Sequence, residues 1–593
     1  MVSVPNGYTT QVMIPWGTPL NGVAPAFAGD GTNTAAEQAL QIGANHDGMK
    51  FYPLPAGSEN SDRGLLVVNH EYSNSTLYAG DGRSVDADGN PTDPDEVRKD
   101  INAHGVSVVE LVRDTSGEWS IANTGFNRRI TAGTTMNLSG PVAGTDLVVT
   151  AFDTSGMTTR GTVNNCGRGF TPWGTYLATE ENFQGYVTTD EDPIPEEKAR
   201  YGLSATGFGY LWGALAGDAS EVNDEFARWD TTPSGATAAS DYRNASNTFG
   251  WLVEIDPYNP VSTPTKRTAM GRILHEGAEP GRVIADRPIA WYMGDDNRFD
   301  YQYKYVSGGK VSDDRAANAK LLSDGTLYVA RFDEDGTVTW LPLTHGTGPL
   351  TAENGFNDQG DVMIDTRIAA DLLGATPMDR PEDAQPRGDG TAYIMLTNNT
   401  KRTEDEVNAA NPRADSSFGH IIEIKEDGGN HAATKGRWSI LVKCGDPSVS
   451  DVGAQWNPET SENGWFGSPD NCAIDADGRL WVSTDQGSNW AKTGKSDGLY
   501  AVETEGEARG TSKLFFRCPV GGEMCGPYFT DDGETLFVAV QHPGTDGTKN
   551  IPGFERESTF EDPATRWPDF DPKMPPRPAV VVVTKQGGGK IGV

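Results

Sequence analysis

A short internal repeat constrains the fold more than any other feature of this chain. Each copy has a glycine or a turn, then a hydrophobic and aromatic strand, then polar residues. The copies lie at residues 64–71, 174–181, 288–296, 390–399, 478–485 and 533–542. Because one such unit cannot bury both of its faces alone, it must pack against its neighbours. Six units therefore predict an all-β fold, a six-bladed β-propeller.

Further strand patterns complete most of these units after a loop of variable length. They lie at residues 105–111, 249–255, 418–424, 498–503 and 578–583. The third copy is followed instead by residues 301–306 and by a hairpin at 325–331 and 336–340. The 71 glycines and 37 prolines fit many short strands joined by turns. We therefore expect residues 1–593 to form a single propeller domain.

One region, residues 183–245, departs from the strand pattern. Residues 195–201 and 220–228 look helical, and their acidic starts favour a helix N-terminus. We expect this region to be a small, partly helical insertion between strands of the second blade, capping one face.

The register of the repeat predicts where side chains meet. Counting eight residues back from Gly174, Gly390, Gly478 and Gly533 reaches four residues that can bind metals. These residues are Cys166, Glu382, Asp470 and Cys525. In a propeller this position begins the innermost strand, so equivalent positions converge on the central channel. The other two blades carry His46-Asp47 and His275-Glu276. Acids are common in this chain, so chance placement is the alternative.

Net charge excludes some partners. The formal charge is −36, from 48 basic and 84 acidic residues, and such a surface repels nucleic acid and anionic membranes. No stretch of eighteen apolar residues occurs, so we expect no membrane-spanning helix. The chain begins Met1-Val2-Ser3-Val4 without a leader, which fits either a cytoplasmic protein or one whose leader is absent.

The predicted channel combines two kinds of metal donor. Carboxylates favour hard cations such as calcium, whereas a single thiolate favours a transition metal, iron included. The candidate donors are Cys166, Glu276, Glu382 and Asp470, with Glu180 and Glu181 as further candidates. They lack the paired Cys/His spacing of a structural zinc site. A mixed metal cluster satisfies both donor types.

Such a cluster would bind an anion such as phosphate and lower the pKa of an oxygen nucleophile. Arg380 stands two residues before Glu382, so we expect it at the channel mouth, where its planar fork suits phosphate. The alternative for Arg380 is a surface salt bridge.

Other motifs carry less chemistry. The Asp-x-Asp-Gly runs at residues 333–336 and 475–478 lack the glutamate that closes a calcium loop, so they are hairpin turns. Neither a phosphate-binding glycine loop nor a Gly-x-Ser-x-Gly elbow occurs in a suitable context. Five cysteines make no disulfide framework, although Cys518 and Cys525 could pair.

Several of these segments together resemble the PhoX-type alkaline phosphatases. The matching segments span nearly the whole chain in order: residues 45–49, 69–71, 136–141, 164–167, 171–182, 275–277, 292–296, 380–383, 468–471 and 521–526. The resemblance implies a monomeric periplasmic or secreted enzyme, exported through a twin-arginine signal, that hydrolyses phosphate monoesters and releases phosphate. It also implies a cluster of ferric iron (Fe3+) and calcium (Ca2+) ions joined by an oxo bridge.

The resemblance also implies roles for individual residues. Cys166 would be the iron-binding thiolate, with Glu276, Glu382 and Asp470 as ligands to iron or calcium. Glu180 or Glu181 would lie behind them, and Asp296 is expected among the ligands. Asn137 and Arg380 would hold the substrate phosphate, and Glu276 is expected to take part in catalysis. Cys525 would be lost as a ligand if it paired with Cys518.

Two other functions remain open from the sequence. A calcium-dependent propeller of another class, such as a phosphodiesterase or a lactonase, needs the carboxylates but has no evident use for Cys166. A non-enzymatic binding propeller with structural calcium would leave Arg380 and Asn137 without a role.

Overall fold

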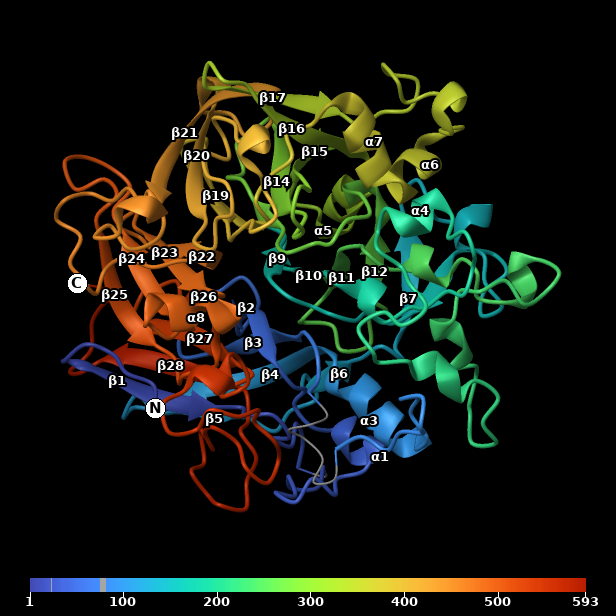
Figure 1. The fold of residues 1–593 in the computed structure, drawn as a ribbon, viewed down its shortest axis with the longest axis horizontal. Helices are drawn as coiled ribbons and strands as arrows, with labels where there is room; N and C mark the ends of the chain where they lie inside the picture. Colours follow the sequence, from blue (N-terminus) through green and yellow to red (C-terminus); the bar gives the residue numbers. More distant parts are fainter. Residues whose placement is uncertain (23, 75–81, 593) are drawn as a thin grey trace.

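Sheets arranged around a common centre make up most of the molecule (Figure 1). The computed structural model describes residues 1–22, 24–74 and 82–592. The strands nearest the centre are β2 (His46–Pro53), β9 (Arg168–Phe170), β13 (Glu279–Pro280), β18 (Pro381–Pro386), β22 (Pro469–Ile474) and β26 (Glu523–Phe529). Each of them contacts the next in this order, and β26 contacts β2. These strands therefore form a closed ring, and the fold is all-β and propeller-like.

Each central strand pairs in antiparallel fashion with the next strand along the chain. These second strands are β3 (Arg63–His70), β10 (Tyr176–Ala178), β14 (Pro288–Gly294), β19 (Thr391–Leu396), β23 (Leu480–Thr484) and β27 (Thr535–Gln541). They coincide with the copies of the sequence repeat. The strands predicted from the repeat are therefore confirmed.

A third strand continues each sheet outward. The third strands are β4 (Gly105–Arg113), β11 (Val253–Ile255), β15 (Gln302–Lys310), β20 (His420–Glu426), β24 (Gly498–Val502) and β28 (Ala579–Lys585). Beyond β15 lie β16 (Gly325–Phe332) and β17 (Thr337–Pro342), as the predicted hairpin required.

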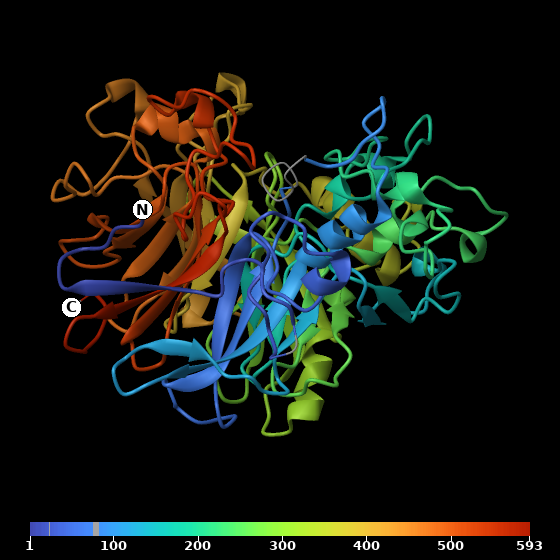
Figure 2. The same ribbon diagram turned by 90° about the horizontal axis from the view of Figure 1, so that it is seen from below.

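The outer strands connect or close the sheets. β17 pairs with β21 (Lys435–Lys443), which joins two units into one nine-stranded sheet. β1 (Tyr8–Met13) pairs with β28, so the first strand of the chain completes the sheet of the last, and both termini lie on the same side of the molecule (Figure 2). The remaining strands are β5 (Trp119–Ile121), β6 (Arg128–Ile130), β7 (Thr135–Ser139), β8 (Thr158–Arg160), β12 (Thr265–Arg267) and β25 (Ser512–Arg517).

Burial on both faces explains why the strands read as near-continuous apolar runs. In β3, Leu65 and Val67 pack in one hydrophobic cluster, while Leu66 and Val68 pack in another. A sheet covered on both sides needs apolar residues at consecutive positions. The hydrophobic cores therefore lie between neighbouring sheets, leaving the central ring for polar side chains.

The helices are short and lie in loops. They are α1 (Ala35–Gln38), α3 (Pro94–Ala103), α4 (Glu196–Ala199), α5 (Arg315–Asn318), α6 (Gln359–Ile364), α7 (Thr366–Leu373) and α8 (Trp490–Thr493). Among the described residues, no helix is both long and apolar enough to cross a membrane.

Residues 183–245 lie between β10 and β11, to one side of the sheets (Figure 2). Their helical content is α4 and several 3-10 turns. The prediction of a helix at residues 220–228 is wrong. Asn223 and Asp224 interrupt it, because their backbones are left-handed, with φ of 54° and 53°. Only a 3-10 turn at Ala227–Trp229 forms there.

Candidate metal centre

The residues at the starts of the central strands converge. Asp47, Glu382 and Asp470 are each the second residue of their strand, and Cys525 is the third of β26. Cys166 and Glu276 lie just before β9 and β13. Four groups of side chains have ligand atoms within 4.8 Å of one another: Asp47, Glu71 and Cys166; Asp47, Glu523 and Cys525; Cys166, Glu181 and Glu276; and Glu276, Glu382 and Asp470. Because the groups share members, they form one continuous cluster, hereafter the acidic cluster.

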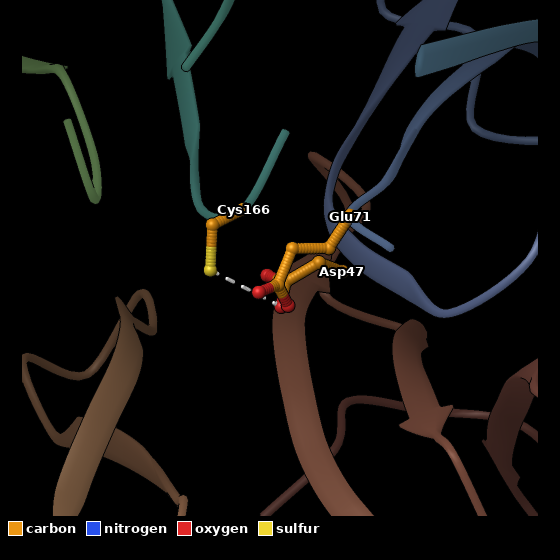
Figure 3. Close-up of side chains that lie close together, drawn as sticks. All are labelled: Asp47, Glu71 and Cys166. Carbon is orange, nitrogen blue, oxygen red and sulfur yellow. Dashed lines mark hydrogen bonds between the residues drawn. The ribbon is translucent and has the colours of Figure 1, made fainter. Parts of the chain in front are cut away.

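Figure 3 shows how one of these groups is assembled from distant parts of the chain. The carboxylates of Asp47 and Glu71 approach from one side, and the thiol of Cys166, in the segment before β9, points toward them. The Sγ atom of Cys166 lies 3.5 Å from Oδ2 of Asp47. The convergence expected from the repeat register is therefore observed.

A recurring backbone irregularity aims these side chains at the centre. Two residues before Asp47, Cys166, Glu382 and Asp470, the backbone is left-handed, a conformation that is unfavourable for residues other than glycine. The residues concerned are Asn45, Asn164, Arg380 and Ser468, with φ of 38°, 50°, 57° and 53°. In β2, β18 and β22 the pairing register then shifts just after the ligand position. Such bulges re-aim side chains next to functional sites.

Glycines let the central strands approach one another at the cluster. A Cβ atom on Gly48 would lie 2.4 Å from the backbone nitrogen of Arg168. A Cβ on Gly167 would lie 2.3 Å from the carbonyl oxygen of Glu276. Only glycine fits at either position. Close packing of the backbones therefore requires a glycine directly after Asp47 and directly after Cys166.

Acids also lie at the ends of the second strands; Glu181 was predicted among them, whereas Glu71 and Asp485 were not. Glu71, Glu181 and Asp485 each stand seven residues after a repeat glycine, at Gly64, Gly174 and Gly478. In an antiparallel pair the end of one strand lies beside the start of its partner. Counting forward from the glycine would therefore have found Glu71 and Asp485, whereas Glu523 has no comparable signal.

Burial and mutual repulsion make the acidic cluster costly without cations. Burial raises the pKa of Asp47 to about 6, and burial together with the charge of Asp47 raises that of Glu71 to about 8. The pKa values of Glu276 and Asp470 are raised well above the usual range by burial and by neighbouring carboxylates. Burial also raises the pKa of the Cys166 thiol. These groups can ionise together only if positive charge joins them.

Unpaired ligand atoms show that cations fit the cluster. Oδ1 of Asp47 and Oδ2 of Asp470 are buried and make no hydrogen bond to any described residue. Buried carboxylate oxygens without partners are rare, and metal ions satisfy them. Side-chain amides hold the other oxygens: Gln541 donates to Asp47 and Glu71 at 2.8 and 3.0 Å, and Asn471 donates to Glu276 at 2.8 Å. Amides in this position orient ligands.

Arg380 brings a positive charge to the edge of the cluster. Its guanidinium donates to both carboxylate oxygens of Asp296, at 2.9 and 2.6 Å, and lies 3.0 Å from Glu382. Although burial opposes ionisation, Arg380 holds the pKa of Asp296 below its usual value. The Arg380 side chain is 20% exposed, and its Nη1 lies 3.7 Å from Asp485.

Besides Arg380, three of the predicted site residues lie outside the ligand groups found among the described residues. Asp296, predicted as a metal ligand, borders the cluster and accepts hydrogen bonds from Arg380. Glu180 belongs to none of the ligand groups found among the described residues, because it forms a buried ion pair with Lys266 at 2.6 Å. The prediction that Asn137 holds the substrate phosphate is wrong. Asn137 is exposed on β7, which is separated from β9 by β12, β11 and β10. Four strand spacings place it about 19 Å from the central strand.

The structure shows whether Cys518 and Cys525 form a disulfide. Cys518 and Cys525 are both free and buried, so the possible disulfide between them is not formed. Cys525 therefore remains available to the acidic cluster, where it lies 3.1 Å from Glu523.

The cluster predicts how pH affects protein that has been stripped of cations. A carboxyl whose pKa is raised on folding binds more protons in the folded state. For Glu71 this contribution is fully present below pH 4.5 and is lost as pH rises through about 8. We expect the melting temperature of chelator-treated protein to be a few degrees lower at pH 9 than at pH 6. Differential scanning calorimetry measures this, and added Ca2+ should remove the difference. A metal-free protein that is more stable at pH 9 would contradict this electrostatic account.

Comparison with known proteins places this chain in a family. The sequence profile of the family described as alkaline phosphatase PhoX matches residues 1–544. The chain belongs to the PhoX alkaline phosphatase family. It is accordingly a phosphoric monoester hydrolase, as the sequence predicted.

A solved structure agrees with this assignment. The chain is similar to Pseudomonas fluorescens PhoX, solved in complex with vanadate, a transition state analogue, with 36% identity and a TM-score of 0.87. The alignment covers 100% of this chain and 97% of that one.

More distant structures add little. A gluconolactonase from Xanthomonas campestris is 10% identical over 92% of this chain and 97% of its own, with a TM-score of 0.27. A protein of unknown function from Dyadobacter fermentans is 8% identical over the same shares, with a TM-score of 0.34. Scores this low carry no argument. A search of curated proteins found no match.

Proposed function

We propose that the acidic cluster is the active site of this PhoX-family phosphatase and that it works with bound iron and calcium. The observation that carries the proposal is the convergence of the Cys166 thiol with carboxylates from several strands, within 4.8 Å in each group. A thiolate suits iron and the carboxylates suit calcium, so the donor set supports a mixed Fe3+ and Ca2+ cluster. A calcium-only lactonase or phosphodiesterase would leave Cys166 without a partner.

The residues in and beside the cluster would have different roles in the reaction. Arg380 would bind the phosphate oxygens through Nη1, while Asp296 fixes the orientation of the guanidinium by accepting from Nε and Nη2. Glu276 joins two of the ligand groups and is oriented by Asn471. When bound, the cations would neutralise the phosphate, polarise it and make an oxygen nucleophile available near neutral pH.

Finer features of the architecture belong to the same proposal. The ring of contacts among the central strands supports a six-bladed propeller, in which β17–β21 pairing merges the outer edges of two blades. We propose that residues 1–593 form one such domain, with residues 183–245 as its insertion. We also propose a monomeric enzyme that acts on small phosphate monoesters in the periplasm or outside the cell, after twin-arginine export.

A direct assay tests the proposed function. The protein should hydrolyse 4-nitrophenyl phosphate at least about a hundredfold faster than bis(4-nitrophenyl) phosphate, and vanadate should inhibit it. Prolonged chelation should abolish activity, because the cluster carboxylates then lose the charge that compensates them. Adding back Ca2+ and iron should restore it. Full activity after complete removal of metals, or a preference for the diester, would count against the proposal.

A further inference from the structure

A cavity of about 420 Å³ adjoins the acidic cluster. Glu71 lines this cavity and also belongs to the metal-ligand group with Asp47 and Cys166. Asn164, another lining residue, donates to Oε1 of Glu71 at 3.4 Å. The cavity therefore meets the cluster at Glu71. An ester whose phosphate is held on this side of the cluster would place its leaving group in this space.

Part of the cavity wall is aromatic and comes from residues 183–245. Tyr186, Phe208 and Tyr210 line it, together with Tyr72 from the segment after β3. Tyr186 and Tyr210 stack with ring centroids 4.5 Å apart and planes 13° from parallel. Flat aromatic surfaces of this kind favour planar rings over flexible aliphatic chains.

Hydrogen bonds hold this wall in place before any ligand arrives. The hydroxyl of Tyr210 donates to the carbonyl of Ser73 at 3.3 Å, and Asn164 donates to the hydroxyl of Tyr186 at 3.2 Å. Arg83 donates to the carbonyl oxygens of Gly209 and Tyr210. The rings therefore need little reordering to receive a ligand, and pre-organisation of this kind lowers the entropic cost of binding.

Phe208 is the wall residue with the most uncovered surface. It is 60% exposed, and its backbone N–H donates to the carbonyl of Gly185 at 2.8 Å. Its ring lies against Gly185, where a Cβ atom would come within 2.2 Å of it. A lone exposed phenylalanine is common, but this one borders a cavity that opens onto the cluster. A planar ligand would cover a surface that is otherwise left in water.

We propose that this cavity is a leaving-group subsite that selects phosphate monoesters of planar aromatic groups, such as aryl or nucleoside phosphates. The proposal rests on the proposed function, since it assumes that the phosphate is held at the acidic cluster. Phe208, Tyr210 and Tyr72 would contact the aromatic ring. A small aliphatic group such as glycerol presents no planar surface to these rings.

Replacing Phe208 by alanine tests the subsite. Loss of one aromatic contact should lower kcat/KM for 4-nitrophenyl phosphate about tenfold and leave kcat/KM for glycerol phosphate within about twofold. Phe208→Tyr should keep the wild-type ratio of the two values. Phe570→Ala is the matched control, because Phe570 is also exposed, at 53%, but does not line the cavity.

Binding of non-hydrolysable analogues separates this proposal from the proposed function. Calorimetry should show that phenylphosphonate binds the metal-loaded wild type about tenfold more tightly than methylphosphonate, and that Phe208→Ala removes this difference. Failure of both compounds to bind would overturn the phosphate site and the subsite together. Equal affinities in the wild type, or an unchanged ratio in Phe208→Ala, would overturn the subsite alone.

Discussion

Replacing Cys166 by alanine should lower kcat/KM for 4-nitrophenyl phosphate by at least about a hundredfold and should remove the colour of the purified protein. Cys166 is 7% exposed, and its thiol is shared between two ligand groups of the acidic cluster. A ferric ion bound to a thiolate absorbs visible light through charge transfer, so colour and activity should disappear together. Absorbance spectra and steady-state kinetics measure the two effects.

Cys444→Ala is the matched control for this variant. Cys444 is also a free, fully buried cysteine, but it packs in a hydrophobic cluster with Val442 and Phe466. Its loss should leave the spectrum and the kinetics unchanged. A Cys166→Ala protein with full activity would remove the reason for placing iron in the cluster.

Replacing Arg380 by alanine should lower kcat/KM about 10²- to 10³-fold, mainly by raising KM, while bound metal is retained. The fork would no longer grip phosphate, and Asp296 would lose its ion pair at 2.6 Å. Arg380→Lys should recover only part of the loss, because an ammonium group keeps the charge without the bidentate geometry. Kinetics and metal analysis of each variant separate the two roles.

A surface arginine provides the control for Arg380. Arg331 pairs with Asp333 at 2.9 Å and is 45% exposed, so Arg331→Ala should change neither kinetics nor metal content. Loss of metal from Arg380→Ala would show that Arg380 is a structural counter-charge, and its assignment to phosphate would then fail.

Much of the fold could be predicted because the repeat acts locally. A strand buried on both faces needs consecutive apolar residues, and a tight turn needs glycine. Each unit can therefore be recognised from its own sequence. The shared position of Cys166, Glu382 and Asp470 followed from the same register. Its accuracy has a structural reason, since each is preceded by a left-handed residue two positions earlier.

The errors arose where position along the chain does not fix position in space. Asn137 lies in a conspicuous motif, but its strand joins the outside of a sheet by pairing in parallel with β12. No local sequence pattern predicts this long-range pairing. Glu180 and Glu181 are neighbours in sequence just after β10, yet only Glu181 joins the cluster, while Glu180 pairs with Lys266. Asn223 and Asp224 interrupt an apparently helical segment through their backbone conformation alone.

If the acidic cluster binds catalytic cations, elemental analysis of the purified, active protein should reveal them. We expect iron and calcium together at stoichiometric amounts per chain in the wild type, with iron lost from Cys166→Ala. Fully active protein containing neither metal at stoichiometric amounts would contradict this expectation.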